Sequence, residues 1–274
     1  PALAAALDNE GNPTKALTGF AASCGVGVDA LEKLETDKGS WFVHRATMPG
    51  RPIIQLIPGI LAEAIAAMPI PKPMRWGDHD YAFVRPAHWL VMLHGADVID
   101  GEALGIRAGR ATRGHRFHHP EPVEIANASE WLDRLRDVKV LADQDERRQR
   151  VRDEVASVTP KDMTARLGNE LLEEIANLTE WPVAIACAFD AQFLDVPHEA
   201  LVLTMQTNQK FVPVFSADGQ LTEHFIGVAN IKSRDPAEVR KGYERVIRPR
   251  FADARFFFDE DRKVSLESYQ AALK

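Results

Sequence analysis

Residues 210–229, KFVPVFSADGQLTEHFIGVA, carry the clearest fold signal in this chain. Apolar residues fill two runs on either side of Asp218-Gly219. An Asp-Gly pair between two runs rich in valine, isoleucine and phenylalanine is a strong short-range signal of a β-hairpin, because glycine adopts the positive φ that the turn requires. We therefore predict an antiparallel hairpin formed by residues 210–215 and 221–229.

The segments around this hairpin predict further strands and helices. Residues 183–188 and 86–94 are apolar runs of strand length, and we expect both to form buried strands. Asp37-Lys38-Gly39 marks a second hairpin, and Pro58-Gly59 should kink or restart a helix at 51–68. Helical spacing or capping residues predict further helices at 12–25, 143–158, 167–178, 197–205 and from 236 to about 243. Since these strands and helices do not alternate regularly, we predict an α+β fold with mixed or antiparallel sheets and packed helices.

The composition limits the classes of protein to which the chain can belong. Its 274 residues are 45% hydrophobic, which is enough for a sizeable core, and its formal net charge is −7. Any binding of a polyanion must therefore use a local basic patch on an acidic protein. No apolar run approaches the roughly 20 residues that span a bilayer. The two cysteines, Cys24 and Cys187, form no CxxC motif, so we predict a cytoplasmic protein without membrane association.

The sequence GIRAGRATRGHRFHHP at residues 105–120, called the basic stretch here, is the main candidate for function. Arginine recurs every third residue between glycines, and carboxylates are nearly absent. Guanidinium groups match phosphate oxygens bidentately, so the pattern suits a nucleic-acid backbone. The alternative is a solvated basic hairpin that pairs with acidic neighbours. The candidate phosphate contacts are Arg107, Arg110, Arg113, His115 and Arg116, together with Lys210 and a second cluster of Arg245, Arg248 and Arg250.

Signatures of catalysis are missing from the sequence. There is no Gly-Lys-Ser/Thr phosphate loop, no GxGxxG after a strand and no GxSxG elbow. His79-Asp80 and His118-His119 lack the spacing of three or four residues with which a helix chelates a metal. We therefore predict no catalytic residue and no metal site. Phe117 and Trp76 are candidates to stack on unpaired bases, although aromatic residues at strand spacing are more often core.

Six blocks of sequence resemble one known family. They are MRWG at 74–77, FVRPAHW at 83–89, GRATRGHRF at 109–117, EWPV at 180–183, QK at 209–210 and ERVIRPR at 244–250. In this order they resemble the β subunit of the bacterial two-subunit glycyl-tRNA synthetase, over about residues 12–259. Motif residues can equally be structural, for example as buried ion pairs of Asp80 with Arg85 or of Glu244 with Arg248.

The resemblance implies a fold and a domain organisation. It suggests that most of the chain is similar to the B3/B4 module of the phenylalanyl-tRNA synthetase β subunit, which is also α+β. On this basis we expect a helical and hairpin segment at 1–70, a B3/B4-like domain at 71–260 and the start of a helical linker at 261–274. The resemblance further implies that the chain is an interior piece of a longer subunit.

The resemblance also implies a role. The family attaches glycine to tRNA(Gly) with ATP, and the adenylate-forming site, with its ATP and Mg²⁺, belongs to the partner α subunit. The piece itself is then noncatalytic, binds no cofactor, and supports the ligase by binding tRNA(Gly) and by α2β2 assembly. Two alternatives stay open. One is a hydrolytic editing domain for misacylated tRNA, and the other is a pure assembly module whose arginines face the α subunit.

Overall fold

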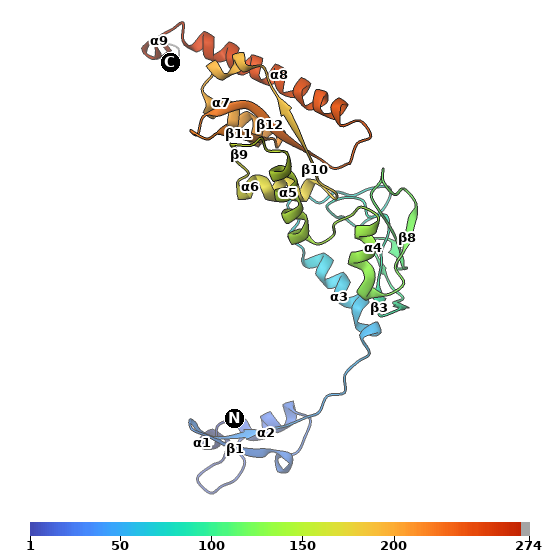
Figure 1. Cartoon of the computed structure of the whole chain (residues 1–274). Coiled ribbons are helices and arrows are strands. Elements are labelled where there is room, and N and C mark those ends of the chain that lie inside the picture. The colour runs from blue at the N-terminus through green and yellow to red at the C-terminus, as the bar shows by residue number, and fades with distance from the viewer. Residues whose placement is uncertain (270–274) are drawn as a thin grey trace. The chain divides into compact units, whose positions relative to one another are not determined.

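The computed structural model describes residues 1–269, in two compact units, Pro1–Leu56 and Ile57–Lys274 (Figure 1). Residues 270–274, which belong to the expected helical linker, lie outside this description. Each unit has a hydrophobic core of its own. The predicted α+β class is confirmed, because helices and small antiparallel sheets are mixed along the described chain.

The first unit consists of short helices and one hairpin. Its elements are α1 (Leu3–Ala6), α2 (Lys15–Ser23), a 3₁₀ turn (Val28–Ala30), β1 (Glu32–Thr36) and β2 (Gly39–Val43). The helix and the hairpin predicted in this segment are both confirmed. Gly39 has a φ of +121° in the hairpin turn, a region that L-residues rarely adopt. The core contains Ala6, Leu17, Ala21, Leu31 and Phe42.

Helix α3 (Ile53–Ala67) is notable for its exposure. It is a single helix that runs through Pro58, whereas the sequence suggested a kink or a restart there. None of its residues is buried, and the side chains of Ile54 and Ile60 are 51% and 56% exposed. The only charged residue in the helix is Glu63. Leu56, Ile57, Leu61 and Ile65 are half-buried, so the exposed apolar area is one part of the helix, and such exposed apolar area is typical of a surface that contacts another protein segment.

The second unit begins with three pairs of very short strands. These pairs are β3 (Leu93–His94) with β4 (Asp97–Val98), β5 (Glu102–Ala103) with β6 (Ile106–Arg107), and β7 (Ala111–Arg113) with β8 (Pro122–Glu124). A 3₁₀ turn (Ala128–Glu130) and helix α4 (Trp131–Asp137) follow. Val123, Ile125 and Val138 form a small core between these elements.

The predicted buried strand at 86–94 is wrong in extent. Only Leu93–His94 is strand, and Val91 makes one isolated parallel bridge to Gly109. Trp89 is 48% exposed. The strand is short because it has no long strand to pair with. The neighbouring segments turn back at Gly95 and Gly105 after two residues each.

A four-stranded antiparallel sheet organises the rest of the unit. Its order is β10 (Val183–Ala188), β12 (Leu221–Ala229), β11 (Val212–Ser216) and β9 (Met163–Ala165). The predicted strand at 183–188 and the predicted hairpin are confirmed. Gly219, with a φ of +81°, lies in the hairpin turn as the Asp-Gly signal requires.

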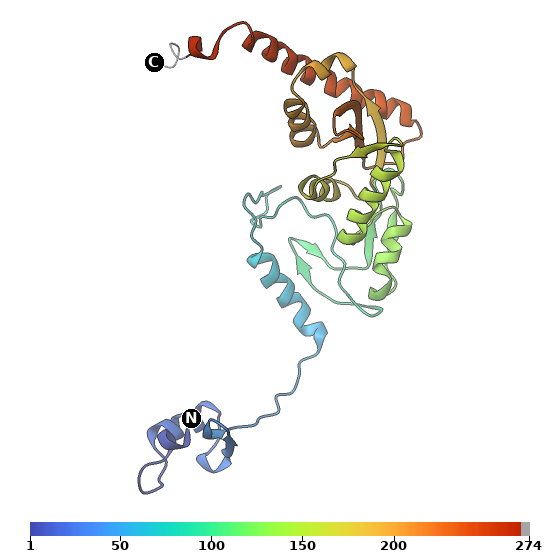
Figure 2. The same cartoon turned by 60° about the vertical axis from the view of Figure 1, so that its left-hand side comes forward.

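Helices cover both faces of this sheet (Figures 1 and 2). One face packs on α5 (Gln144–Val158) and α6 (Asn169–Leu178), and the other packs on α7 (His198–Leu203) and α8 (Pro236–Asp261). Adjacent residues of β12 point to opposite faces of the sheet. Phe225 packs in the core with α7 and α8, and Ile226 packs in the core with α5 and α6. The remaining elements are a 3₁₀ turn (Ala191–Asp195), a π-helical turn (Thr204–Gln209) and α9 (Leu266–Tyr269).

Helix α8 does not end near residue 243 as the sequence suggested. It continues to Asp261 with Pro249 inside it. An interior proline costs about 3 kcal/mol or more because it removes one hydrogen bond and clashes with the preceding turn. Ile247 and Phe251, on either side of Pro249, are completely buried in the core against the sheet. Burying two such side chains stabilises by about 1.5–3 kcal/mol each, which offsets the cost.

Candidate nucleic-acid interface

The basic stretch is built from short strands and tight turns. Leu104 and Gly105 have φ values of +52° and +72° in the turn between β5 and β6. A Cβ atom on Gly105 would collide with the hydroxyl oxygen of Tyr81, so only glycine fits. Gly114 is equally constrained, since a Cβ atom there would lie 2.6 Å from the Cβ of Val138. The glycines of the stretch thus allow close packing of its backbone.

Arg107 and Arg110 are the first two candidate arginines of the stretch, and both have partners within the protein. The Nη2 atom of Arg107 lies 3.0 Å from a carboxylate oxygen of Asp100, in an exposed ion pair. Arg110 donates to three backbone carbonyls, of Ala96 at 2.9 Å, Ala126 at 3.3 Å and Ile125 at 3.4 Å. Because it ties together two turns that are distant in sequence, Arg110 has a structural role.

His115 is buried, with 2% of its surface exposed. Its Nδ1 atom accepts hydrogen bonds from the N–H groups of Phe117 and His118, at 3.2 and 3.3 Å. These two donors assign the ring proton to Nε2, which donates to the carbonyl oxygen of Asn230 at 2.5 Å. Both ring nitrogens are therefore occupied. The burial of His115 removes it from the side chains that can contact a phosphate.

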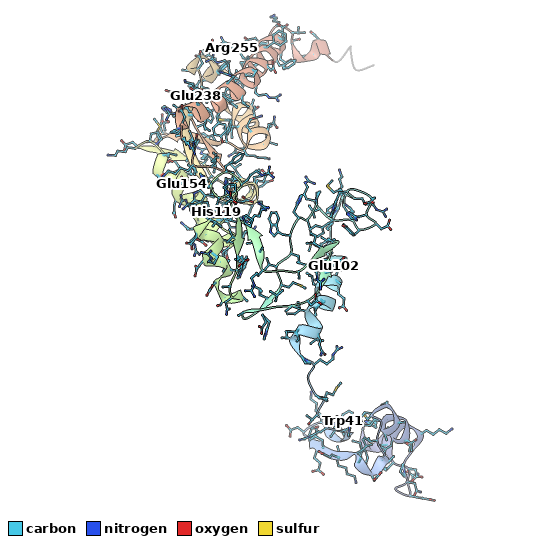
Figure 3. All side chains as sticks on the ribbon, turned by 90° about the vertical axis from the view of Figure 1, so that its right-hand side faces the viewer. Trp41, Glu102, His119, Glu154, Glu238 and Arg255 are labelled. Carbon is cyan, nitrogen blue, oxygen red and sulfur yellow. The ribbon has the colours of Figure 1, made fainter. Side chains whose placement is uncertain are left out.

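His118 makes a second contact with the segment after β12. Its Nε2 atom accepts from the N–H of Lys232 at 3.1 Å. Burial lowers the pKa of His118, and its electrostatic interactions with His115, Lys139 and Lys232 lower it further. His119, labelled in Figure 3, donates its N–H to the carbonyl of His115 at 2.8 Å. These histidines fix the end of the basic stretch to the sheet.

The remaining members of the basic stretch face solvent. Arg113 is exposed and donates only to the carbonyl of Pro120, at 3.0 Å. Arg116 is exposed, and within residues 1–269 no carboxylate or carbonyl accepts from its guanidinium group. The ring of Phe117 is 74% exposed. Arg116 and Phe117 are consecutive residues, and their guanidinium group and aromatic ring are both exposed to solvent.

A polar pocket of about 470 Å³ adjoins these two residues. It lies between the end of the basic stretch, the end of α6 and the end of β12. In the wall of the pocket, the guanidinium group of Arg147 donates hydrogen bonds to the carbonyl oxygens of Ala176 and Leu141, both at 2.5 Å. The pocket is lined by His115, Arg116, Phe117, Arg147, Asn177, Leu178, Thr179, Glu180 and Asn230.

The other candidate cations lie elsewhere on the unit. Lys210 forms an ion pair with Glu174 at 2.7 Å and donates to the carbonyl of Thr207 at 2.8 Å. Arg245, Arg248 and Arg250 are exposed on α8, and none has an ion pair within the described residues. Arg245 lies nine residues after Pro236, about 14 Å along the helix. The structure therefore brings the basic stretch to the start of α8 but leaves these arginines farther along it.

The structural ion pairs suggested by the sequence are not formed. A carboxylate oxygen of Asp80 lies 3.9 Å from Arg75, not Arg85, and both side chains are exposed. A carboxylate oxygen of Glu244 accepts from the N–H of Ala188 at 3.0 Å, so it caps the edge of β10 and does not pair with Arg248.

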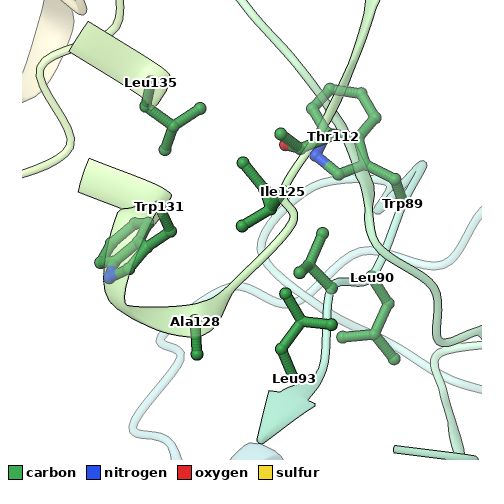
Figure 4. A pocket seen from close by; sticks show the side chains of 9 residues that line it. Trp89, Leu90, Leu93, Thr112, Ile125, Ala128, Trp131 and Leu135 are labelled. Carbon is green, nitrogen blue, oxygen red and sulfur yellow. The ribbon is translucent and has the colours of Figure 1, made fainter. Parts of the chain in front are cut away.

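An apolar pocket lies between the short strands and helix α4 (Figure 4). Its volume is about 450 Å³, and the half-exposed rings of Trp89 and Trp131 form two of its walls. It contains no titratable side chain, so it offers no group for acid–base chemistry. Its other lining residues are Leu90, Val91, Leu93, Thr112, Ile125, Ala128 and Leu135.

The family model for "Glycyl-tRNA synthetase beta subunit" matches residues 1–274. The chain belongs to this family. A glycine-tRNA ligase beta subunit of Xanthomonas campestris pv. campestris (strain B100) is 56% identical over 274 residues, which are 100% of this chain and 39% of the relative. One from Xylella fastidiosa (strain M12) is 52% identical over 275 residues, 100% of this chain and 38% of the relative. The chain thus spans about two fifths of the length of these relatives.

Two features of this site were missed in the sequence. Asn230 accepts from the N–H groups of Glu180 and Trp181, at 2.7 and 2.9 Å, while its own carbonyl accepts from His115. Trp181 lies between two cations, with the Nζ of Lys139 4.7 Å and the Cζ of Arg150 5.1 Å from its ring centre. The EWPV block at 180–183 was the only part of the sequence that drew attention to this region, and no motif near Asn230 predicted its role.

Two further properties bear on the chemistry of the described chain. No three histidine, cysteine, aspartate or glutamate side chains within residues 1–269 gather as a metal site would need. No helix in the same part of the chain is long and apolar enough to cross a membrane.

Proposed function

We propose that this chain supports the glycylation of tRNA(Gly) as part of a glycine-tRNA ligase β subunit, by binding tRNA and by contributing to α2β2 assembly. In this proposal the α subunit carries the adenylation site with its ATP and Mg²⁺, and the complex acts in the cytoplasm. Membership of the family and identities above 50% over the whole chain support it. The two cysteines are free, as a reducing compartment allows.

One observation carries the tRNA-binding part of the proposal. Five candidate arginines are exposed and have no carboxylate partner within residues 1–269, so their charge is free for phosphate oxygens. Other arginines of the second unit pair with acids, as Arg136 does with Glu146 and Arg148 with Glu173, although Arg85, Arg152 and Arg234 are also exposed without an acidic partner in the described residues. We call the five the open arginines. They are Arg113, Arg116, Arg245, Arg248 and Arg250.

The other four candidates are set aside for stated reasons. Arg107 and Lys210 are paired with Asp100 and Glu174. Arg110 donates to three backbone carbonyls, and His115 is buried. The open arginines therefore form a shorter and more specific set than the sequence offered.

The tRNA-binding part is tested with the full-length α2β2 complex and tRNA(Gly) across a salt series. One variant carries Arg113→Ala and Arg116→Ala. We expect weaker binding and a shallower dependence of log affinity on log salt, by about 0.7–0.9 for each phosphate that the variant no longer neutralises. Wild-type affinity and slope in a folded variant would contradict the proposal.

A matched control removes the same number of positive charges at positions away from the open arginines. Arg134→Ala with Lys263→Ala removes two exposed cations that pair with Asp137 and Glu260. We expect this control to bind tRNA with the slope of the wild type. A second variant, Arg245→Ala with Arg248→Ala and Arg250→Ala, tells whether α8 contributes.

The assembly part is supported by helix α3. Its exposed isoleucines and its single charge fit a surface that another polypeptide covers. We expect Ile54→Glu with Ile60→Glu to weaken capture of the α subunit by the β subunit, measured by co-purification. Ala62→Glu with Ala66→Glu is the control for two added charges on exposed positions of the same helix. Equal capture by all three proteins would contradict a role for α3.

Hydrolytic editing, the other alternative, lacks support in the described residues. It requires a group that activates water next to an aminoacyl ester. The histidine in the polar pocket, His115, has both nitrogens occupied by the backbone. Glycine is also the smallest amino acid, so larger ones can be excluded by size. Deacylation of alanyl-tRNA(Gly) above the buffer rate would reverse this judgement.

A further inference from the structure

We propose that the polar pocket beside the basic stretch binds one unpaired RNA nucleotide, with its base stacked on Phe117 and its phosphate on Arg116. This inference rests on the proposed tRNA binding and goes beyond it. It assigns a defined subsite and a ligand class, a single-stranded nucleotide, to one end of the basic stretch.

The exposure of Phe117 supports the base. A phenylalanine ring that is 74% exposed buries little apolar area in the protein, and therefore contributes little to folding. The backbone that carries it is nevertheless held in place, because its N–H donates to the buried Nδ1 atom of His115. An open aromatic ring on a fixed backbone can act as a platform on which unpaired bases stack, whatever the identity of the base.

The charges around the pocket support the phosphate. Arg116 has no acidic partner in the described chain, and Arg113 has none either and donates only to the carbonyl of Pro120. Arg147 adds a positive charge to the wall, although its donors are engaged by carbonyls. Each nucleotide of an RNA strand carries one base and one phosphate. A cation next to an aromatic ring can therefore contact the phosphate of the nucleotide whose base stacks on the ring.

Two exposed polar side chains in the lining of the pocket can contact the edge of a base. The Oδ1 atom of Asn177 accepts from Gln144 at 3.0 Å, which leaves its amide N–H groups as donors. The carboxylate of Glu180 has no ion pair within residues 1–269 and can accept from an exocyclic amine. Its charge also disfavours a phosphate at that end, which places the phosphate towards Arg116.

The size of the pocket agrees with this ligand. A volume of about 470 Å³ lies within the range of sites for small ligands and exceeds what one side chain would fill. The pocket is polar, in contrast to the apolar pocket at Trp89 and Trp131. An apolar anchor from a protein partner would suit the apolar pocket better, which is why we commit to a nucleotide here.

The test uses the α2β2 complex, tRNA(Gly) and substitutions at Phe117. Phe117→Leu removes the ring and keeps an apolar side chain, and Phe117→Trp keeps a ring. We expect Phe117→Leu to weaken binding about five- to a hundredfold without changing the salt slope, and Phe117→Trp to bind as the wild type. Phe256→Leu makes the same change at another exposed ring and should have no effect.

Photochemical cross-linking of the bound tRNA gives a second readout. We expect a nucleotide attached to the peptide that contains Phe117, and loss of this adduct when Arg116 is changed to alanine but not to lysine. Unchanged affinity of a folded Phe117→Leu complex, or a cross-link from this peptide to the α subunit in place of RNA, would overturn the nucleotide site.

The two proposals fail in different ways. If the variants of the open arginines lose salt-dependent binding while Phe117→Leu binds normally, only the nucleotide site is wrong. If the arginine variants bind tRNA as the wild type does, the proposed function is wrong and the nucleotide site falls with it.

Discussion

The Nε2 atom of His115 lies 2.5 Å from the carbonyl oxygen of Asn230, although 115 positions separate the two residues. This hydrogen bond joins the basic stretch to the segment that leads from β12 into α8. Since the ring is buried and its Nδ1 atom accepts from two further N–H groups, one side chain determines the conformation of residues 115–118. Replacing it should therefore affect both stability and the polar pocket.

We expect His115→Ala to lower the free energy of unfolding of the second unit by about 1–3 kcal/mol, because it leaves buried backbone groups without partners. Urea denaturation followed by far-UV circular dichroism measures the loss. His198→Ala, at an exposed histidine of α7, should change stability by less than about 0.5 kcal/mol. Equal stability of both variants would show that the buried ring is dispensable.

The stability of the second unit should depend on the protonation of His118. Its pKa is lowered in the folded protein below the ordinary value of 6.5, so the unfolded chain takes up the proton first. The stabilisation is complete above pH 6.5 and is lost as pH falls from 6.5 towards the lower pKa. The groups that face the ring are His115, Lys139 and Lys232.

His118→Gln tests this pH dependence, since glutamine offers Lys232 an acceptor but does not titrate. We expect the difference in unfolding free energy between the wild type and the variant to change between pH 7.5 and 5.5, with the wild type losing more. Parallel curves over this range would exclude His118 as the source.

Gly227 should not tolerate a side chain. A Cβ atom there would lie 2.5 Å from the ring of Tyr243, where β12 packs on α8. We expect Gly227→Ala to destabilise by about 1–3 kcal/mol through overpacking. Gly242→Ala is the control on α8, where a Cβ atom meets nothing within 4 Å and alanine should be neutral or stabilising by up to about 1 kcal/mol. The two melting temperatures, compared by calorimetry, give the answer.

The two cysteines should differ in reactivity. Burial raises the pKa of Cys187 to about 12, so almost none of it is thiolate at pH 8. Cys24 is only half-buried. We expect iodoacetamide to alkylate Cys24 while the protein is folded and Cys187 only after denaturation, as peptide mass spectrometry would show. Rapid labelling of Cys187 at pH 8 would mean that the core around β10 opens readily.

The sequence predicts those parts of the fold that depend on neighbouring residues. The hairpin at Asp218-Gly219 and the strand at 183–188 are found because turn chemistry and apolar runs are local signals. The strand at 86–94 and the end of α8 are missed, because a pairing partner and a core are supplied by distant segments. In the same way, the sequence marks His115 as basic but gives no sign that Asn230 buries it.

The separation of 115 positions between His115 and Asn230 also has a consequence in time. A bacterial ribosome adds about 5–20 residues per second, so the basic stretch is synthesised roughly 6–23 s before its partner exists. During that interval the polar pocket lacks the wall that Asn230 provides, and the arginines lie on a segment that is not yet bonded to the sheet. We expect nascent chains arrested before Asn230 leaves the ribosome to be cut by trypsin at Arg113 and Arg116, and longer chains to resist. Synthesis thus delays the formation of the polar pocket until the sheet beneath it is complete.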